Sequence, residues 1–220
     1  MIYYDLRDQK VHPGLPGANF LISGRMNYLA HAYLSFDQPE ILTGNMISDF
    51  VKGKQKFAYP PSVQQGIAMH RMIDTFTDSH LEIRAAKSIF RSAYGLYASP
   101  IVDVCMDFFV ANDPSSFSDP QSLEDFSFNT YEHLEKNLPE LPERFRQMFP
   151  SMKAHNWLYN YRLEYGIERS LAGLVRRAKF MTDHQPAFEL FIKHQSELRE
   201  RYDNFYPELK NEALRFLAEI

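Results

Sequence analysis

The stretch Pro100-Ile-Val-Asp-Val-Cys-Met-Asp-Phe-Phe-Val-Ala111 decides the fold of this chain. Every position after Pro100 is apolar except Asp103 and Asp107, which lie one helical turn apart. Because a helix that is apolar on all sides must be enclosed by other elements, this stretch predicts the central helix of a helical core. Two buried carboxylates need compensating partners, which salt bridges to arginines or a metal ion would supply.

The segments around this helix repeat the helical signal. From Met26 onward apolar residues recur at steps of three and four, with almost no strand-like alternation. One apolar stripe runs from Phe188 to Phe216; Pro186 opens it, and Pro207 is expected to kink or split the helix. Other prolines, Pro150 among them, fall between periodic segments and leave roughly nine or ten helices.

The chain length favours one domain. We expect a single-domain, all-α helical bundle over residues 26–220, and a flexible N-terminal extension over residues 1–25, which are rich in Gly and Pro. A lone cysteine, Cys105, excludes an internal disulfide and a thiolate zinc site, and it is expected in the core.

Composition also limits the partners. The 24 basic and 28 acidic side chains give a net charge of -4, so no nucleic-acid partner is expected. No apolar run approaches the ~18 residues of a membrane-spanning helix, and the N-terminus lacks the apolar core of a secretory signal. We therefore expect a cytoplasmic protein with no membrane span.

Histidine and aspartate recur at helical spacing beside apolar residues. His70, Asp74 and Asp78 cover an arc of about 80° on one helix face. A solvated polar stripe is the plain alternative, but exposed faces ordinarily use better helix formers than Asp. Asn27 with His31, and Asn45 with Asp49, repeat the four-residue spacing among apolar neighbours.

Imidazole and carboxylate groups thus come from four predicted helices. Such a mixed nitrogen and oxygen donor set suits Mn²⁺, Fe²⁺ or Mg²⁺, and Zn²⁺ less well. The pattern predicts a metal-dependent hydrolase that activates water and neutralises a phosphoryl oxygen. The residues with metal-binding side chains are His31, Asp49, His70, Asp74, Asp78, Asp103 and Asp107.

Four pieces of sequence resemble the acyl carrier protein phosphodiesterase (ACP hydrolase) family, an outlying relative of the HD-type metal-dependent phosphohydrolases. They are Met26-Asn-Tyr-Leu-Ala-His31, Gly44-Asn45 with Ser48 to Gly53, Gly66 to Asp74 with Thr77-Asp78, and Pro100 to Val110. The resemblance implies an HD-phosphohydrolase-like fold and a Mn²⁺-dependent reaction. That reaction is hydrolysis of the phosphodiester that joins 4′-phosphopantetheine to a serine of holo-acyl carrier protein. The family commonly has Asp-His where this chain has Asp107-Phe108.

Roles follow from this chemistry. Arg71 and Lys52 are expected to hold the phosphate, because a guanidinium can donate two parallel hydrogen bonds to its oxygens. His80 is either the general acid or an exposed histidine at a helix start. The predicted metal ligands are His31, Asp49, His70, Asp74 and Asp107, and their supporting neighbours are Asn27, Asn45, Asp78 and Asp103.

An acidic carrier protein as substrate would dock on a basic surface. Arg169, Arg176, Arg177 and Lys179 form one such cluster, and Arg84, Lys87 and Arg91 another. The alternative interpretation is that both clusters are ordinary solvated helix faces. Two other functions stay open: an HD-like phosphohydrolase of a small phosphoester or nucleotide, and a catalytically weakened protein that binds holo-carrier protein.

Overall fold

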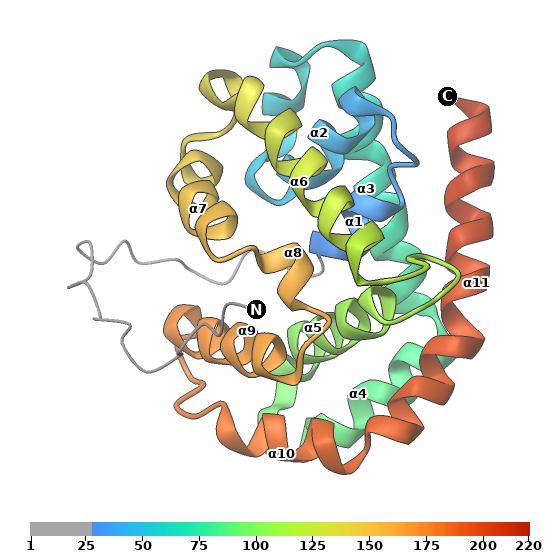
Figure 1. The fold of residues 1–220 in the computed structure, drawn as a ribbon, viewed down its shortest axis with the longest axis vertical. Helices are drawn as coiled ribbons and strands as arrows, with labels where there is room; N and C mark the ends of the chain where they lie inside the picture. Colours follow the sequence, from blue (N-terminus) through green and yellow to red (C-terminus); the bar gives the residue numbers. More distant parts are fainter. Residues whose placement is uncertain (1–27) are drawn as a thin grey trace, which may run out of the picture.

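The computed structural model describes residues 28–220, and this part of the chain consists of helices joined by turns and loops, without strands (Figure 1). The predictions for residues 1–25 and for Asn27 concern positions outside the described residues. The α-helices are α1 (Tyr28–Tyr33), α2 (Pro39–Ile47), α3 (Pro61–Ser79), α4 (Leu81–Tyr94), α5 (Ala98–Ala111), α6 (Pro120–Lys136), α7 (Glu143–Ala154), α8 (Trp157–Asn160), α9 (Glu164–Arg177), α10 (Gln185–Lys193) and α11 (Gln195–Glu219). Short 3-10 helices are η1 (Ser48–Phe50), η2 (Gly53–Ala58), η3 (Gly95–Tyr97) and η4 (Leu138–Glu140).

Helix α5 is the central helix that its sequence predicts. It contacts α1, α4, α9 and α11, and Figure 1 shows it in the middle of the bundle. Asp103 and Asp107 are both buried, and Cys105 is a core residue with no exposed surface. The all-α class and the buried position of this helix are therefore confirmed.

Helices α2 and α3 pack backbone against backbone because glycine stands at their contact. A Cβ atom on Gly44 would lie 2.1 Å from the carbonyl oxygen of Val63, and one on Gly66 would lie 2.3 Å from that of Ile41. No real side chain fits at such distances, so only glycine permits this approach. The contact brings Asn45, which follows Gly44, beside His70, one turn after Gly66.

The C-terminal half of the chain departs from the sequence prediction in two places, and Pro207 has one of its two expected effects. The long stripe is divided at His194, where α10 ends and α11 begins. Pro207 lies inside α11 and does not split it; Figure 1 shows the helix changing direction midway along its length. Pro150 also lies inside a helix, α7, rather than between segments. Packing along α7 and α11 outweighs the hydrogen bond that each proline removes.

Within the described residues, the stretch Leu81–Ala111 is long and apolar enough by composition to cross a membrane. It comprises α4, η3 and α5, and more than half of its most apolar window is buried inside the fold. A core helix has the same properties, so this stretch is weak evidence for a membrane span.

Candidate metal centre

Two histidines and an aspartate from α1 and α3 meet inside the bundle. Ligand atoms of His31, His70 and Asp74 all lie within 4.8 Å of one another. The two imidazole rings are stacked, with centroids 3.9 Å apart and planes inclined by 14°. His31 Nε2 lies 3.5 Å from one oxygen of Asp74, and His70 Nε2 lies 3.5 Å from the other. The four-residue spacing of His70 and Asp74 along α3 produces this group, as the sequence predicts.

Asn45 fixes the orientation of both imidazoles. Its side-chain NH₂ donates to the carbonyl of His31 and to Ser35 Oγ, so its Oδ1 is free to accept from His31 Nδ1–H at 2.7 Å. Its backbone carbonyl accepts from His70 Nδ1–H at 2.8 Å. In its neutral form each ring therefore carries its proton on Nδ1 and directs the lone pair of Nε2 into the group, which is the arrangement of metal-binding histidines.

The two Nε2 atoms are buried and have no hydrogen-bond partner. A buried polar atom without a partner costs stability unless something outside the protein chain satisfies it. The carboxylate oxygens at 3.5 Å are too distant for a strong hydrogen bond. A divalent cation held between the two imidazoles and the carboxylate fits this donor set.

The charges of the group are strongly coupled. Burial, together with the neighbouring His70, lowers the pKa of His31. Burial also acts to lower the pKa of His70, but Asp49 and Asp74 outweigh it and raise this pKa to about 9. Burial acts to raise the pKa of Asp74, and the two histidines more than reverse the effect, so its pKa is lowered. Without a metal, one proton on His70 therefore neutralises part of the acidic charge.

Asp49 joins the group from η1, the 3-10 turn that follows α2. Its Oδ1 lies 3.5 Å from His70 Nε2, and its side chain is 19% exposed, against 21% for Asp74. The following residue, Phe50, anchors the turn by an edge-on contact with Phe145 at 5.6 Å. The turn thus directs Asp49 toward His70.

The two predicted phosphate-holding residues lie next to this turn. Arg71 is exposed and donates from Nη2 to the carbonyl of Val51 at 3.3 Å, and Lys52 is exposed at the next position. Both residues are therefore exposed and lie at the segment that directly follows η1.

Asp107 makes a different contact from the predicted one. Its two oxygens accept from the backbone N–H groups of Leu29 at 3.2 Å and Ala30 at 2.9 Å, at the N-terminus of α1. Burial raises its pKa well above the usual range, although these two hydrogen bonds oppose the rise. Its contacts indicate a residue that positions α1 rather than a metal ligand. Asp103 is buried one turn earlier on α5.

Asp78 and His80 are engaged at the corner between α3 and α4. Asp78 forms an ion pair with Lys87 at 2.9 Å. His80 accepts the backbone N–H of Glu82 at 3.3 Å as the cap of α4, and its Nε2 lies 3.3 Å from Glu208 on α11. These contacts favour a helix-start histidine over a general acid, and they place Asp78 outside the group of His31, His70 and Asp74.

Phe108 occupies the position where the family commonly has histidine. Its ring packs edge-on against Phe191 of α10 at 5.2 Å and against Phe109 at 5.4 Å. The side chain at this position thus contacts α10, so the exchange of histidine for phenylalanine removes no group from the cluster formed by α1, α3 and η1.

The predicted docking residues differ in exposure. Arg169, Arg176 and Lys179 are exposed, but Arg177 is half-buried, its Nη2 atom is enclosed, and its charge acts on Tyr28 and Tyr161. Lys87 is buried, in its ion pair with Asp78, so neither Arg177 nor Lys87 is an exposed docking residue.

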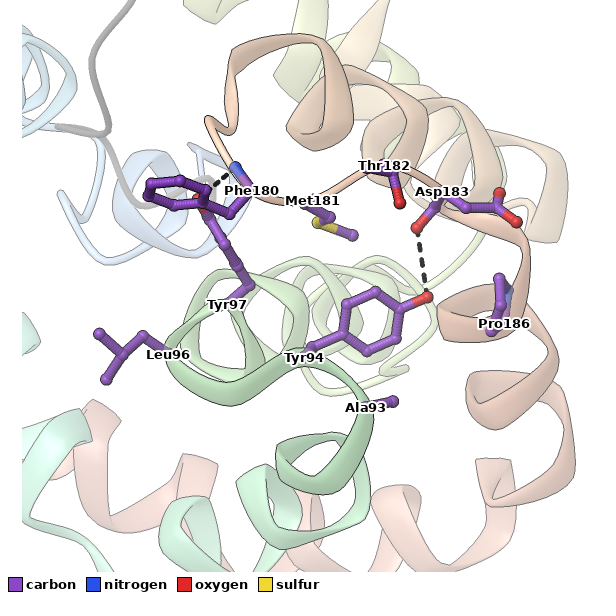
Figure 2. Close-up of a pocket in the computed structure, with 9 residues that line it drawn as sticks. All are labelled: Ala93, Tyr94, Leu96, Tyr97, Phe180, Met181, Thr182, Asp183 and Pro186. Carbon is purple, nitrogen blue, oxygen red and sulfur yellow. Dashed lines mark hydrogen bonds between the residues drawn. The ribbon is translucent and has the colours of Figure 1, made fainter.

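A shallow hollow lies between the end of α4 and the segment that joins α9 to α10 (Figure 2). The hydroxyl of Tyr94 donates to the carbonyl of Asp183 at 3.2 Å, and Tyr97 accepts the N–H of Phe180 at 3.1 Å. None of the predicted site residues lines it. Sequence reasoning did not single out this hollow or the two inward tyrosines, Tyr28 and Tyr161; only Tyr28 lies within a motif, between Met26 and His31.

Comparisons with known proteins agree on one family. The sequence model of the family described as acyl carrier protein phosphodiesterase matches residues 26–209. A protein named acyl carrier protein phosphodiesterase from Escherichia coli O6:H1 is 32% identical over 190 residues, which cover 86% of this chain and 98% of the relative. The protein of that name from Salmonella agona is 33% identical over the same shares. No solved structure matches this chain significantly. The chain belongs to the acyl carrier protein phosphodiesterase family.

Proposed function

We propose that this chain is a metal-dependent phosphodiesterase that acts on holo-acyl carrier protein. It hydrolyses the bond between 4′-phosphopantetheine and the carrier serine, and it releases apo-carrier protein. The proposal is supported by the relatives of that name, whose length this chain covers almost completely. The observation that carries the chemistry is the pair of buried Nε2 atoms, without hydrogen-bond partners, that face Asp74.

The metal ligands in this proposal are His31 Nε2, His70 Nε2 and a carboxylate oxygen of Asp74, with Asp49 completing the set from η1. Two imidazoles with carboxylates favour Mn²⁺ or Fe²⁺ over Mg²⁺, which prefers oxygen ligands. When bound, such a cation neutralises a phosphoryl oxygen and lowers the pKa of a coordinated water molecule. Asn45 holds the imidazoles, and Arg71 with Lys52 binds phosphate oxygens.

Recognition of the carrier protein needs an exposed surface of suitable chemistry. Leu96 and Phe180, which flank the hollow in Figure 2, are 95% and 75% exposed. The ammonium of Lys179 lies 5.1 Å from the centre of the Phe180 ring, and Arg169 is exposed on α9. Apolar side chains beside basic ones suit an acidic, amphipathic helix of the carrier protein. We place the reaction in the cytoplasm.

The experiment measures the intact mass of holo-acyl carrier protein after incubation with the purified protein and Mn²⁺, beside a chelated sample. We expect a metal-dependent loss of one phosphopantetheine. Asp74→Asn should abolish the loss, whereas Asp78→Asn, one turn later on α3, should retain it. Far-UV circular dichroism checks that both variants fold. An active Asp74→Asn variant would contradict the ligand assignment, and no loss in any sample would contradict the reaction.

The same samples separate this function from its alternatives. A protein that cleaves a small phosphodiester but not the holo-carrier protein is the small-substrate hydrolase. A protein that binds holo-carrier protein without cleaving it is the inactive binder. Charge reversal at Lys179 should raise KM for the carrier protein and leave cleavage of a small diester unchanged, and equal losses on both substrates would argue against the docking surface.

A further inference from the structure

Two guanidinium groups converge at the end of α9, over a residue without a side chain. A Cβ atom on Gly173 would lie 3.5 Å from Arg176 Nη2 and 3.8 Å from Arg177 Nη2. The two arginines thus fold back along their own helix toward one place, where their like charges repel each other. This arrangement is unfavourable unless a negative charge lies near both.

Within residues 28–220, no group supplies that charge at Arg177. Its Nη2 is buried and has no hydrogen-bond partner. Among the residues that the structure describes, the groups that act favourably on its charge are two phenols, Tyr28 and Tyr161, and no carboxylate pairs with it. Enclosing guanidinium nitrogen atoms without a compensating charge destabilises the fold. Such a group is suited to an anionic ligand.

Neither of the two tyrosine hydroxyls donates to a strong hydrogen-bond acceptor. The hydroxyl of Tyr161 is buried without a hydrogen-bond partner, and that of Tyr28 donates to the sulfur of Met148 at 3.3 Å, a weak acceptor. Neutral hydroxyls are good donors to an oxyanion, and burial raises the pKa of both, so they stay protonated. These two hydroxyls lie within electrostatic range of the Arg177 guanidinium.

Tyr28 also belongs to the helix that carries His31 of the candidate metal centre. Tyr28 opens α1 and lies one turn before His31, on the same helix face. Asp49 raises the pKa of its phenol and Arg177 lowers it, so the hydroxyl lies within electrostatic range of both. Tyr28 thus connects the arginine pair with the carboxylates of the metal centre.

We propose that Arg176, Arg177, Tyr28 and Tyr161 form an oxyanion-binding site for a phosphate ester. The guanidinium of Arg177 donates to non-bridging phosphate oxygens, Arg176 closes the site from the solvent side, and the tyrosines donate from the interior. Assigning this ester to the phosphopantetheine arm rests on the proposed function, whereas phosphate binding itself does not. It also reassigns Arg177, predicted as a docking residue, to the interior.

The test uses the full chain with all metal removed by chelation, so that the metal centre cannot hold the anion. Inorganic phosphate and 4′-phosphopantetheine are titrated into it by calorimetry, and tryptophan fluorescence is followed in parallel. The chain has one tryptophan, Trp157, whose ring centre lies 6.4 Å from that of Tyr28, so its emission reports on this place. We expect saturable binding of both probes with a change in emission.

Arg177→Gln should weaken both probes at least tenfold, and Tyr161→Phe a few fold. Arg146→Gln, an exposed arginine on α7, is the matched control and should leave binding unchanged. If Arg177→Gln does not fold, Arg177→Lys keeps the charge without the planar fork and should bind with intermediate affinity. Wild-type affinity in Arg177→Gln or Arg177→Lys, or no phosphate binding by the native chain, would overturn the inference. Phosphate binding lost in Arg177→Gln without any cleavage of holo-carrier protein would overturn the proposed function alone.

Discussion

Asn45→Ala removes the residue that orients the two candidate metal-binding histidines. Asn45 is fully buried and makes three side-chain hydrogen bonds, to His31 Nδ1 at 2.7 Å, to the His31 carbonyl at 2.8 Å and to Ser35 Oγ at 3.2 Å. At about 1 kcal/mol net for each bond, the loss of unfolding free energy is about 3 kcal/mol. The His70 imidazole keeps its bond to the backbone carbonyl of residue 45, so only His31 loses its orientation.

Metal affinity should therefore fall in this variant by about 10- to 100-fold, the usual effect of losing one support of a ligand. Calorimetric titration with Mn²⁺ measures the affinity, and urea denaturation of the metal-free protein measures the stability. Thr43→Val is the matched control, because Thr43 lies on the same helix and its hydroxyl bonds Pro39 and His133 instead. It should lose about 1 kcal/mol and bind the metal normally. A folded Asn45→Ala protein with wild-type Mn²⁺ affinity would refute the reasoning.

Three further predictions concern the glycine contact between α2 and α3, the phenylalanine at position 108, and the pH dependence of metal binding. Gly66→Ala should lower the free energy of unfolding by about 3 kcal/mol or more, because its Cβ atom would lie 2.3 to 2.9 Å from backbone atoms of α2. Gly173→Ala is the control: no atom lies nearer than 3.5 Å to its Cβ position, so its Tm should be nearly unchanged or higher. Equal changes of Tm in the two variants would contradict this reasoning. Phe108→His should cost about 1 to 2 kcal/mol in urea denaturation through its lost contacts with α10 while kcat stays the same, and a large gain in activity would mean that position 108 reaches the site. Without metal, protonation of His70 stabilises the fold; this contribution is complete below the unfolded pKa of 6.5 and is lost as the pH rises through about 9. Because a metal must displace that proton, the affinity for Mn²⁺ should rise with pH over this range and then level off. An affinity for Mn²⁺ that stays constant between pH 7 and 9 would exclude this coupling.

The sequence predicted the class of fold and the core of the candidate site, because both follow from spacing along one helix. His70 and Asp74 meet since residues four apart share a helix face, and α5 is buried since it has no polar face. The contacts of Asp78 and His80 were not predictable in this way. Their partners, Lys87 and Glu208, come from other elements, and spacing along α3 does not predict which residues of other elements will contact it.

The orientation of Arg177 was likewise not predictable from spacing along one helix. On α9 its neighbours in sequence are basic, which favours an exposed cluster, and Arg169 and Lys179 are indeed exposed. The inward direction of Arg177 depends on Tyr28, which is about 150 residues earlier in the chain, and on the space that Gly173 leaves. A tertiary contact over that separation has no signature in local composition.

Asp107 shows how α5 serves the candidate centre without contributing a ligand to it. A buried carboxylate can be satisfied by a metal or by the free N–H groups at a helix start, and spacing along α5 does not distinguish the two. Here both oxygens bind the first turn of α1, and His31 lies in the next turn of that six-residue helix. A helix this short is not stable alone, so its direction depends on what holds its ends. The buried aspartate of α5 therefore sets the direction in which α1 presents His31 to Asp74, and a change at Asp107 should alter metal affinity through the position of His31.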